Sequence, residues 1–140
     1  MKILNILIAL LLVSAEVLLL YAGYFLFYPF KPVTFNKDRF AIENKEVKKG
    51  EILYYTADVC KNMEIATELS RSFNNEFVYL LPTTVSTRPV GCSVTKVAIP
   101  IPEELPTGDY YLRTRFTYRL NVLRTITVTH DTEGFKVTEK

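Results

Sequence analysis

The chain has 140 residues, of which 17 are basic and 15 acidic, and its net charge is +2. This near balance excludes a protein that binds nucleic acid through bulk positive charge. Hydrophobic residues make up 49% of the chain, which excludes an intrinsically disordered protein. Two cysteines and one histidine are too few for a Cys/His zinc site, and we expect neither a metal nor a cofactor.

The N-terminal segment is hydrophobic and has only two charged side chains in 30 residues. The stretch from Ile3 to Phe30 exceeds the ~20 apolar residues that a transmembrane helix needs. Tyrosine and phenylalanine residues crowd its C-terminal end, as they do at the membrane interface, and Pro29 and Pro32 end the helix. We therefore predict a transmembrane signal anchor over residues 1–30 and a separate domain over residues 31–140.

A cleaved signal peptide is the alternative. Lys2 supplies a minimal basic region, and Val13-Ser14-Ala15 is an acceptable small-residue cleavage site. Cleavage there would leave Glu16 and fourteen further, mostly apolar residues at a free N-terminus, which is a poor start for a soluble domain. The apolar stretch is also far longer than the ~7–15 residues of a signal-peptide core, so the pattern favours an uncleaved anchor.

Glu16 lies near the middle of this apolar segment, where a charged carboxylate costs about 2.5–3.5 kcal/mol on insertion scales. Ala9 and Gly23 lie seven residues before and after it, on the same helix face. Small residues that flank a polar one let a second helix approach closely. We predict a helix-packing seam of Ala9, Glu16 and Gly23, against another membrane protein or a second copy. The alternative is that so apolar a helix merely tolerates Glu16.

Two features of the chain indicate opposite membrane orientations. Lys2 precedes the helix, whereas Lys31, Lys37 and Arg39 follow it, so the positive-inside rule favours a cytoplasmic C-terminal domain. The two cysteines and the type of the following domain favour an oxidising compartment instead. We predict a single-pass protein of the cytoplasmic (inner) membrane, with its C-terminal domain extracytoplasmic, in the periplasm.

Residues 31–140 lack helical periodicity and contain short β-rich runs between turn signals, which predicts a sandwich or barrel of seven or eight strands. The clearest run is Tyr110 to Leu120, where inward and outward side chains alternate as in a half-buried antiparallel strand. Asn44 to Gly50, Pro82 to Gly91 and Glu133-Gly134 are expected to be turns or loops. The other expected strands are Val33 to Ile42, Ile52 to Cys60, Met63 to Phe73, Phe77 to Leu81, Cys92 to Ile99, Leu123 to Thr129 and Phe135 to Val137.

Several phrases resemble known proteins. LPTGDYYLRTRFTY resembles the penultimate strand of bacterial immunoglobulin-like domains, and VKKGEILYYTADV resembles their second strand. The whole chain is similar to small membrane-anchored proteins of unassigned role encoded in bacteriophage genomes, through YYTADVCK, PVGCSV, LPTGDYYL and LRTITVTHDTEGFKV. The resemblance implies an all-β immunoglobulin-like sandwich of antiparallel strands, although the buried tryptophan of antibody domains is missing. The motifs are structural and imply no activity.

Cys60 closes the second long strand and Cys92 opens a later one. In a sandwich of this type those two strands are antiparallel neighbours, so we predict a disulfide between them. Closing a loop of about 33 residues contributes roughly 3.7 kcal/mol in the chain-entropy treatment. The alternative is a pair of free, buried thiols, because the bond requires an oxidising compartment.

A basic stripe is expected on the polar face of the clearest strand. Arg113, Arg115 and Arg119 share that face, and Arg124 follows across the hairpin. We treat them as candidate partner-binding residues for phosphate headgroups, a glycopolymer or an acidic protein. The alternative is an ordinary solvated face whose arginines pair with acidic residues on adjacent strands.

Residues of catalytic type are sparse. His130, Asp131 and Glu133 fall in an expected exposed turn, and Glu103-Glu104 is a solvated pair. No Ser-His-Asp or Cys-His arrangement and no glycine-rich phosphate loop is recognisable. We therefore predict no catalytic residue and no enzyme.

The interpretation that follows is a non-enzymatic, membrane-anchored binding or structural protein, such as an accessory subunit of an envelope or virion assembly. One alternative is a phage-encoded regulator of lysis or superinfection that acts through its membrane helix. Another is a secreted soluble domain after signal cleavage. The expected partners are the lipid bilayer and another membrane protein or a second copy through the helix, with no specific nucleic-acid binding.

Overall fold

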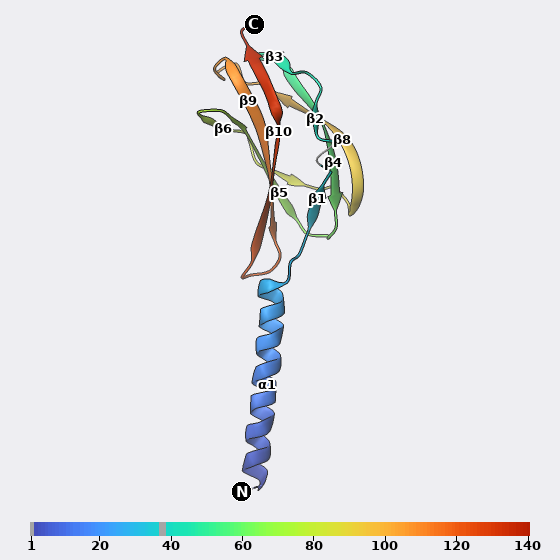
Figure 1. Ribbon diagram of the computed structural model, residues 1–140, viewed down its shortest axis with the longest axis vertical. Helices are drawn as coiled ribbons and strands as arrows, with labels where there is room; N and C mark the ends of the chain where they lie inside the picture. Colours follow the sequence, from blue (N-terminus) through green and yellow to red (C-terminus); the bar gives the residue numbers. More distant parts are fainter. Residues whose placement is uncertain (1, 37–38) are drawn as a thin grey trace. The chain divides into compact units, whose positions relative to one another are not determined.

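The computed structural model describes residues 2–36 and 39–140, and in those residues it contains one helix followed by ten strands (Figure 1). The chain divides into two compact units, residues 1–30 and residues 31–140. Lys37, which enters the charge comparison above, lies outside the described residues.

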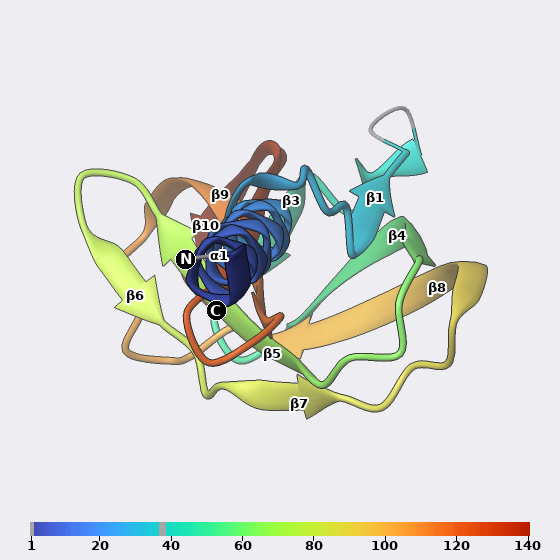
Figure 2. The ribbon, with the colours of Figure 1, turned by 90° about the horizontal axis from the view of Figure 1, so that it is seen from below.

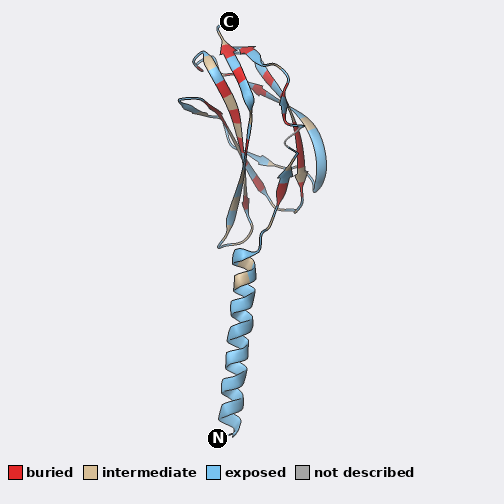
Figure 3. Cartoon of the chain, viewed as in Figure 1, coloured by how far each residue is buried: buried red, intermediate tan, exposed pale blue. Residues whose placement is uncertain are grey.

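The first unit is a single apolar helix, α1 (Lys2–Phe27). Its 26 residues rise about 39 Å at 1.5 Å each, enough to cross a hydrocarbon core of about 30 Å. None of its described residues is buried (Figure 3). By length and composition it qualifies as a membrane span, and a signal sequence near an N-terminus meets the same criteria.

The second unit contains two β-sheets. The smaller sheet has four strands, all antiparallel, and is built around its long central strand. That strand pairs with one long strand along one edge and with two short strands along the other. The central strand is β4 (Ile52–Lys61), the long neighbour is β8 (Gly91–Pro100), and the short ones are β1 (Val33–Phe35) and β2 (Ala41–Ile42).

The larger sheet has six strands in the order β3-β10-β9-β5-β6, with β7 also paired to β5. Every pair is antiparallel except β3 with β10, which is parallel. Figure 2 shows the short β7 beside β5. The strands are β3 (Glu46–Lys48), β5 (Thr67–Asn74), β6 (Val78–Leu80), β7 (Thr84–Ser86), β9 (Gly108–Arg119) and β10 (Thr125–Thr138).

The core lies between the inward faces of the two sheets. On the long strands, buried residues alternate with more exposed ones, which confirms the alternation predicted for Tyr110 to Leu120 (Figure 3). On β4 the inward set includes a charged residue, Lys61, at the end of an apolar series. The buried apolar residues of both sheets are Val33, Phe40, Ile42, Val47, Leu53, Tyr55, Ala57, Val59, Leu69, Phe73, Ile99, Ile101, Leu105, Tyr110, Leu112, Tyr118, Phe135 and Val137.

Two tight turns reverse the chain between strands. Gly50 joins β3 to β4 with a φ of +77°, in the left-handed region that favours glycine, and its N–H donates to the Ile101 carbonyl (3.0 Å). In the turn between β9 and β10, the Asn121 side-chain oxygen accepts a hydrogen bond from the Leu123 N–H (2.9 Å). Such a local hydrogen bond from the backbone to a side chain satisfies an N–H group that has no partner strand where the chain reverses.

Three segments expected to be turns or loops contain strand structure. The predicted turn from Asn44 to Gly50 contains β3, because Val47 is buried against the core while its neighbours stay exposed. The predicted loop from Pro82 to Gly91 contains β7. Glu133-Gly134 is not a turn: β10 continues through it, and the pairing with β9 shifts between Asp131 and Gly134. A bulge uses the same residue types as a turn, which explains the wrong prediction.

Strand bounds elsewhere differ in detail. The expected run from Val33 to Ile42 contains two short strands, β1 and β2, and residues 37 and 38 within it lie outside the described residues. The expected run from Met63 to Phe73 begins only at Thr67. The two expected final strands are one strand, β10. Because β3 and β7 are additional and one expected run is divided, the described residues still contain ten strands where seven or eight were predicted.

Candidate functional site

The candidate binding surface is the outward face of β9 and of its neighbours β10 and β5. Because side chains alternate across a strand, the buried Leu112, Thr114 and Tyr118 point inward and the residues between them point away from the core. We call the outward surface the Arg/Thr face. It includes Glu68 and Ser70 on β5, Arg113, Arg115, Thr117 and Arg119 on β9, and Thr125, Thr127, Thr129 and Asp131 on β10.

The register of β9 on β10 decides what each arginine meets. Arg113 is opposite Asp131, whereas Arg115 is opposite Thr129 and Arg119 is opposite Thr125. Directly opposite side chains on one face of a sheet are the pairs that interact. One arginine of the stripe therefore faces a carboxylate and the other two face hydroxyl groups.

Arg113 and Asp131 form a two-pronged ion pair on this face. Arg113 Nε donates to Asp131 Oδ1 and Arg113 Nη2 donates to Oδ2, both at 2.7 Å. These bonds lower the pKa of the Asp131 carboxyl and raise the pKa of the Arg113 guanidinium, while partial burial opposes both shifts. Asp131 is thus a strand residue engaged in pairing, which corrects its predicted place in an exposed turn.

The ion pair makes stability depend on pH in a defined window. Asp131 has a folded pKa below the unfolded value of about 3.9, so its contribution is fully present above that value and is lost as the pH falls through the folded pKa. We expect wild type to exceed Asp131→Asn in stability at pH 7, and the difference to shrink below about pH 4. Urea denaturation midpoints measured against pH test this.

Asp109→Asn is the matched control, because this exposed aspartate on β9 has no ion pair among the described residues. Its stability should follow wild type across the same pH range. A gap between wild type and Asp131→Asn that stays constant down to pH 2 would contradict the role given to the ion pair.

Arg115 and Arg119 are both exposed, and within residues 2–36 and 39–140 neither has a carboxylate oxygen within 4.0 Å. Beside Arg119 lies a shallow groove of about 390 Å³ whose lining includes Glu68, Val85 and Thr125. Arg124 belongs to the turn rather than to the face: it is half-buried, and its carbonyl accepts the Leu120 N–H (3.0 Å). The two exposed arginines are the cations of this face that remain available to an acidic partner.

His130 belongs to the core and not to an exposed turn. Its neighbours on β10 point outward, whereas the His130 side chain is only 9% exposed. The imidazole stacks on the Phe40 ring with 3.9 Å between ring centres. In the part of the chain that the structure describes, no group of three His, Cys, Asp or Glu side chains could hold a metal ion.

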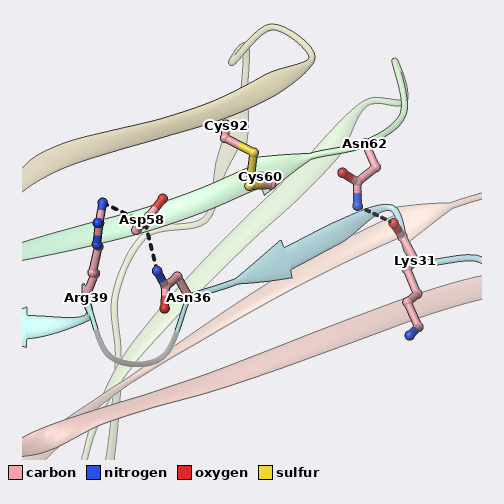
Figure 4. The surroundings of a disulfide bond; sticks show 7 residues. All are labelled: Lys31, Asn36, Arg39, Asp58, Cys60, Asn62 and Cys92. Atoms are coloured by element: carbon pink, nitrogen blue, oxygen red, sulfur yellow. Dashed lines mark hydrogen bonds and ion pairs between the residues drawn. A yellow bond between two sulfur atoms is a disulfide. The ribbon is translucent and has the colours of Figure 1, made fainter.

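Cys60 and Cys92 form a disulfide, as predicted, with an S–S distance of 2.03 Å (Figure 4). They are directly opposite residues of β4 and β8, so the bond covalently links two neighbouring strands of one sheet. Hydrogen bonds around it tie the first residues of the domain to β4 and to the residue that follows it. Asn36 Nδ2 donates to Asp58 Oδ2 (3.3 Å), and Asn62 Nδ2 donates to the Lys31 carbonyl (2.9 Å).

The predicted helix seam lies along α1. Ala9, Glu16 and Gly23 are spaced by seven residues, a step that drifts only about 20° around a helix. Ala9 and Glu16 are exposed and Gly23 is half-buried. A Cβ placed on Gly23 would meet no atom within 4 Å, so the position has room for a second helix. That a second helix packs there remains a prediction.

No protein-family model matches the chain, and a search of curated proteins finds no match either.

Proposed function

We propose that the chain is a non-enzymatic, membrane-anchored binding or structural protein, an accessory subunit of an envelope or virion assembly. The observation that carries this proposal is the unburied apolar surface of α1, which extends over 26 residues. Exposed apolar area costs about 25 cal/mol per Å² in water, so such a helix requires lipid or a protein partner. The helix then anchors the β domain at the cytoplasmic (inner) membrane.

An immunoglobulin-like identity of the domain is part of the proposal. In constant-type immunoglobulin domains, strands A, B, E and D form one sheet and strands C, F and G the other. Taking β1, β4 and β8 as A, B and E, and β5, β9 and β10 as C, F and G, gives the same division for these six strands, while β6 and β7, between C and E, pair with β5 and not in the place of D. This sheet membership supports an immunoglobulin-like fold, and the phage resemblance of the sequence motifs remains a proposal that rests on those motifs alone.

The disulfide supports an extracytoplasmic, periplasmic place for the domain, because such bonds persist in oxidising compartments and are rare in the cytosol. The aromatic residues near the helix end support a membrane boundary there, with the Tyr24, Tyr28 and Phe30 rings packed on one another. Intact-mass measurement of the protein extracted from membranes tests retention of the anchor. Loss of the first 15 residues would make the protein a secreted domain instead.

The Arg/Thr face is the proposed contact with an acidic partner. Arg115 and Arg119 are exposed, so changing both to Gln should alter the free energy of unfolding by less than about 0.5 kcal/mol. The same variant should lose capture of the partner in crosslinking and copurification followed by mass spectrometry. Lys48→Gln, an exposed lysine on β3, is the matched control and should retain it. Unchanged capture by the double variant would remove this face from the proposal.

A second candidate function is a regulator that acts on another membrane protein through the helix, and the exposed Glu16 on α1 favours it. A photo-crosslinker at position 16 and another at position 119 distinguish the two functions. Crosslinks mainly from position 119 favour the binding domain, whereas crosslinks mainly from position 16 favour the helix.

The seam gives a prediction of its own. A lone carboxyl group in hydrocarbon lacks a hydrogen-bond partner, and a neighbouring helix can supply one where small residues allow close approach. We expect Glu16→Leu and Gly23→Ile to insert normally and to weaken helix association about 3- to 30-fold, corresponding to about 0.6–2 kcal/mol. An energy-transfer assay of the full chain in bilayers measures this.

Leu18→Ala is the control for the seam, because residue 18 lies about 200° around the helix from Glu16 at 100° per residue. Its association should equal that of wild type. If both seam variants also associate like wild type, Glu16 is only tolerated in the membrane and the helix has no such seam.

A further inference from the structure

A small cavity of about 60 Å³ lies between the two sheets of the β domain. Arg88, one of its lining residues, belongs to the segment 87–90 that carries the chain from β7 in one sheet to β8 in the other (Figure 2). Three cationic residues line it: Lys61 from β4, Arg71 from β5 and Arg88 from the crossing segment. No aspartate or glutamate is among its lining residues.

The hydrogen bonds of these three cations all go to neutral acceptors. Lys61 Nζ donates to the Arg88 carbonyl (2.9 Å), and Arg71 Nε donates to the Tyr55 hydroxyl (3.2 Å). Arg88 Nη2 donates to Thr95 Oγ1 (2.7 Å). Within residues 2–36 and 39–140, none of the three has a carboxylate oxygen within 4.0 Å. The cavity therefore gathers three positive charges without a negative one.

Two buried hydroxyl groups line the same cavity. Thr114 is 2% exposed and Tyr118 is fully buried, and neither hydroxyl has a hydrogen-bond partner among the described residues. Burial raises the pKa of the Tyr118 phenol, and the nearby Thr67 hydroxyl partly opposes this rise. The two hydroxyls nevertheless do not meet the geometry of a hydrogen bond. A buried polar group without a partner costs about 1–3 kcal/mol.

Charge, donor chemistry and size together select the class of ligand. Lysine and arginine side chains are donors only, and the two hydroxyls can also donate. Buried charges are normally paired, because an uncompensated charge away from water is costly. One water occupies about 10–15 Å³ of such a volume, so the cavity has room for a tetrahedral ion that replaces several waters.

We propose that this cavity is a binding site for a small oxyanion of phosphate size, held by Lys61, Arg71 and Arg88 with the Thr114 and Tyr118 hydroxyls as further donors. Ser86 and Arg88, which are both half-buried, are among its lining residues. The oxyanion is a free ion or the phosphate group of a larger molecule. The bound anion neutralises the three cations and joins the two sheets, because β4 and β5 each supply a ligand.

Thermal unfolding of the full chain in a neutral detergent tests the site, with inorganic phosphate titrated at constant ionic strength. At ten times the dissociation constant, we expect the wild-type Tm to rise by about 5–10 °C. A parallel titration with glycerol 3-phosphate distinguishes the source: a rise with phosphate alone indicates a free ion, and a rise with both indicates that a headgroup ester also fits.

Two variants separate this site from the general stabilisation that phosphate gives as an excluded salt. Lys61→Met and Arg88→Gln should each lose most of the Tm rise, and Lys61→Met without phosphate should be at least as stable as wild type because a buried cation is gone. Lys48→Gln, an exposed lysine on β3 that does not line the cavity, should respond like wild type. Since Arg88 is half-buried, its variant decides the question if Lys61→Met does not fold. Equal responses in wild type and in the cavity variants would overturn the proposal.

Discussion

Replacing both cysteines, by Cys60→Ala with Cys92→Ala, is expected to lower the free energy of unfolding by roughly 3.7 kcal/mol and the Tm by about 15 °C. The bond joins residues 32 positions apart, so it closes a loop that includes β5, β6 and β7. Cys60 is half-buried and Cys92 is exposed, so alanine leaves no large cavity at either position. The loss therefore reports the crosslink itself.

Urea denaturation followed by circular dichroism measures this loss, and Ser93→Ala, at the exposed neighbour of Cys92, is the control with a change below about 0.5 kcal/mol. Alkylation checks the premise: unreduced, denatured protein from fresh membranes should contain no reactive thiol. Two modified thiols would show that the bond does not form in the cell. A double variant as stable as wild type would show that β8 is held by its hydrogen bonds to β4 alone.

Val47→Asp is expected to destabilise the domain by about 4 kcal/mol, enough to unfold a domain of marginal stability. Val47 is 1% exposed and lies opposite the fully buried Val137 in the parallel pair of β3 and β10. The variant loses apolar burial and places a carboxylate where it must either remain charged without water or become protonated.

Glu46→Asp is the matched control, because it keeps a carboxylate at the adjacent position, where the side chain is exposed. We expect it to change stability by less than about 0.5 kcal/mol. Urea midpoints of the two variants give the comparison. Near-equal stability of Val47→Asp and wild type would mean that the segment is the polar turn that its sequence suggests.

The long strands could be predicted because their signals are local. The alternation in β4 and β9 places apolar residues on one face, and the structure buries that face. The disulfide could also be predicted from the sequence, because Cys60 and Cys92 lie at the ends of runs that pair antiparallel. A pattern with a period of two describes a half-buried strand whatever its partner is.

β3 could not be predicted in this way, because its burial comes from a distant segment. The heptapeptide NKEVKKG has one apolar residue among polar ones, and only the pairing of Val47 with Val137 explains why that residue is buried. The bulge in β10 has the same origin: Glu133-Gly134 has the composition of a turn, yet β9 continues to pair on both sides of it. Tertiary pairing overrides such local signals.

The proposed anion site depends both on local sequence signals and on tertiary pairing. Lys61 continues the inward alternation of Leu53, Tyr55, Ala57 and Val59, so its direction was implicit in the sequence. Arg71 likewise lies between the inward residues Leu69 and Phe73 on β5, and the register places it opposite Thr114. A cluster assembled from β4, β5 and a connecting segment appears only once the two sheets have been brought together.

The parallel pairing of β3 with β10 also sets an order of events during synthesis. Glu46 pairs with Lys136, so the two strands are 90 residues apart along the chain (136 − 46). While the ribosome makes residues 49–135, β3 has no neighbour in its sheet and Val47 remains uncovered. Contacts of such long range form slowly, and an unpaired strand attracts other chains. During that interval the growing chain is therefore open to aggregation through β3.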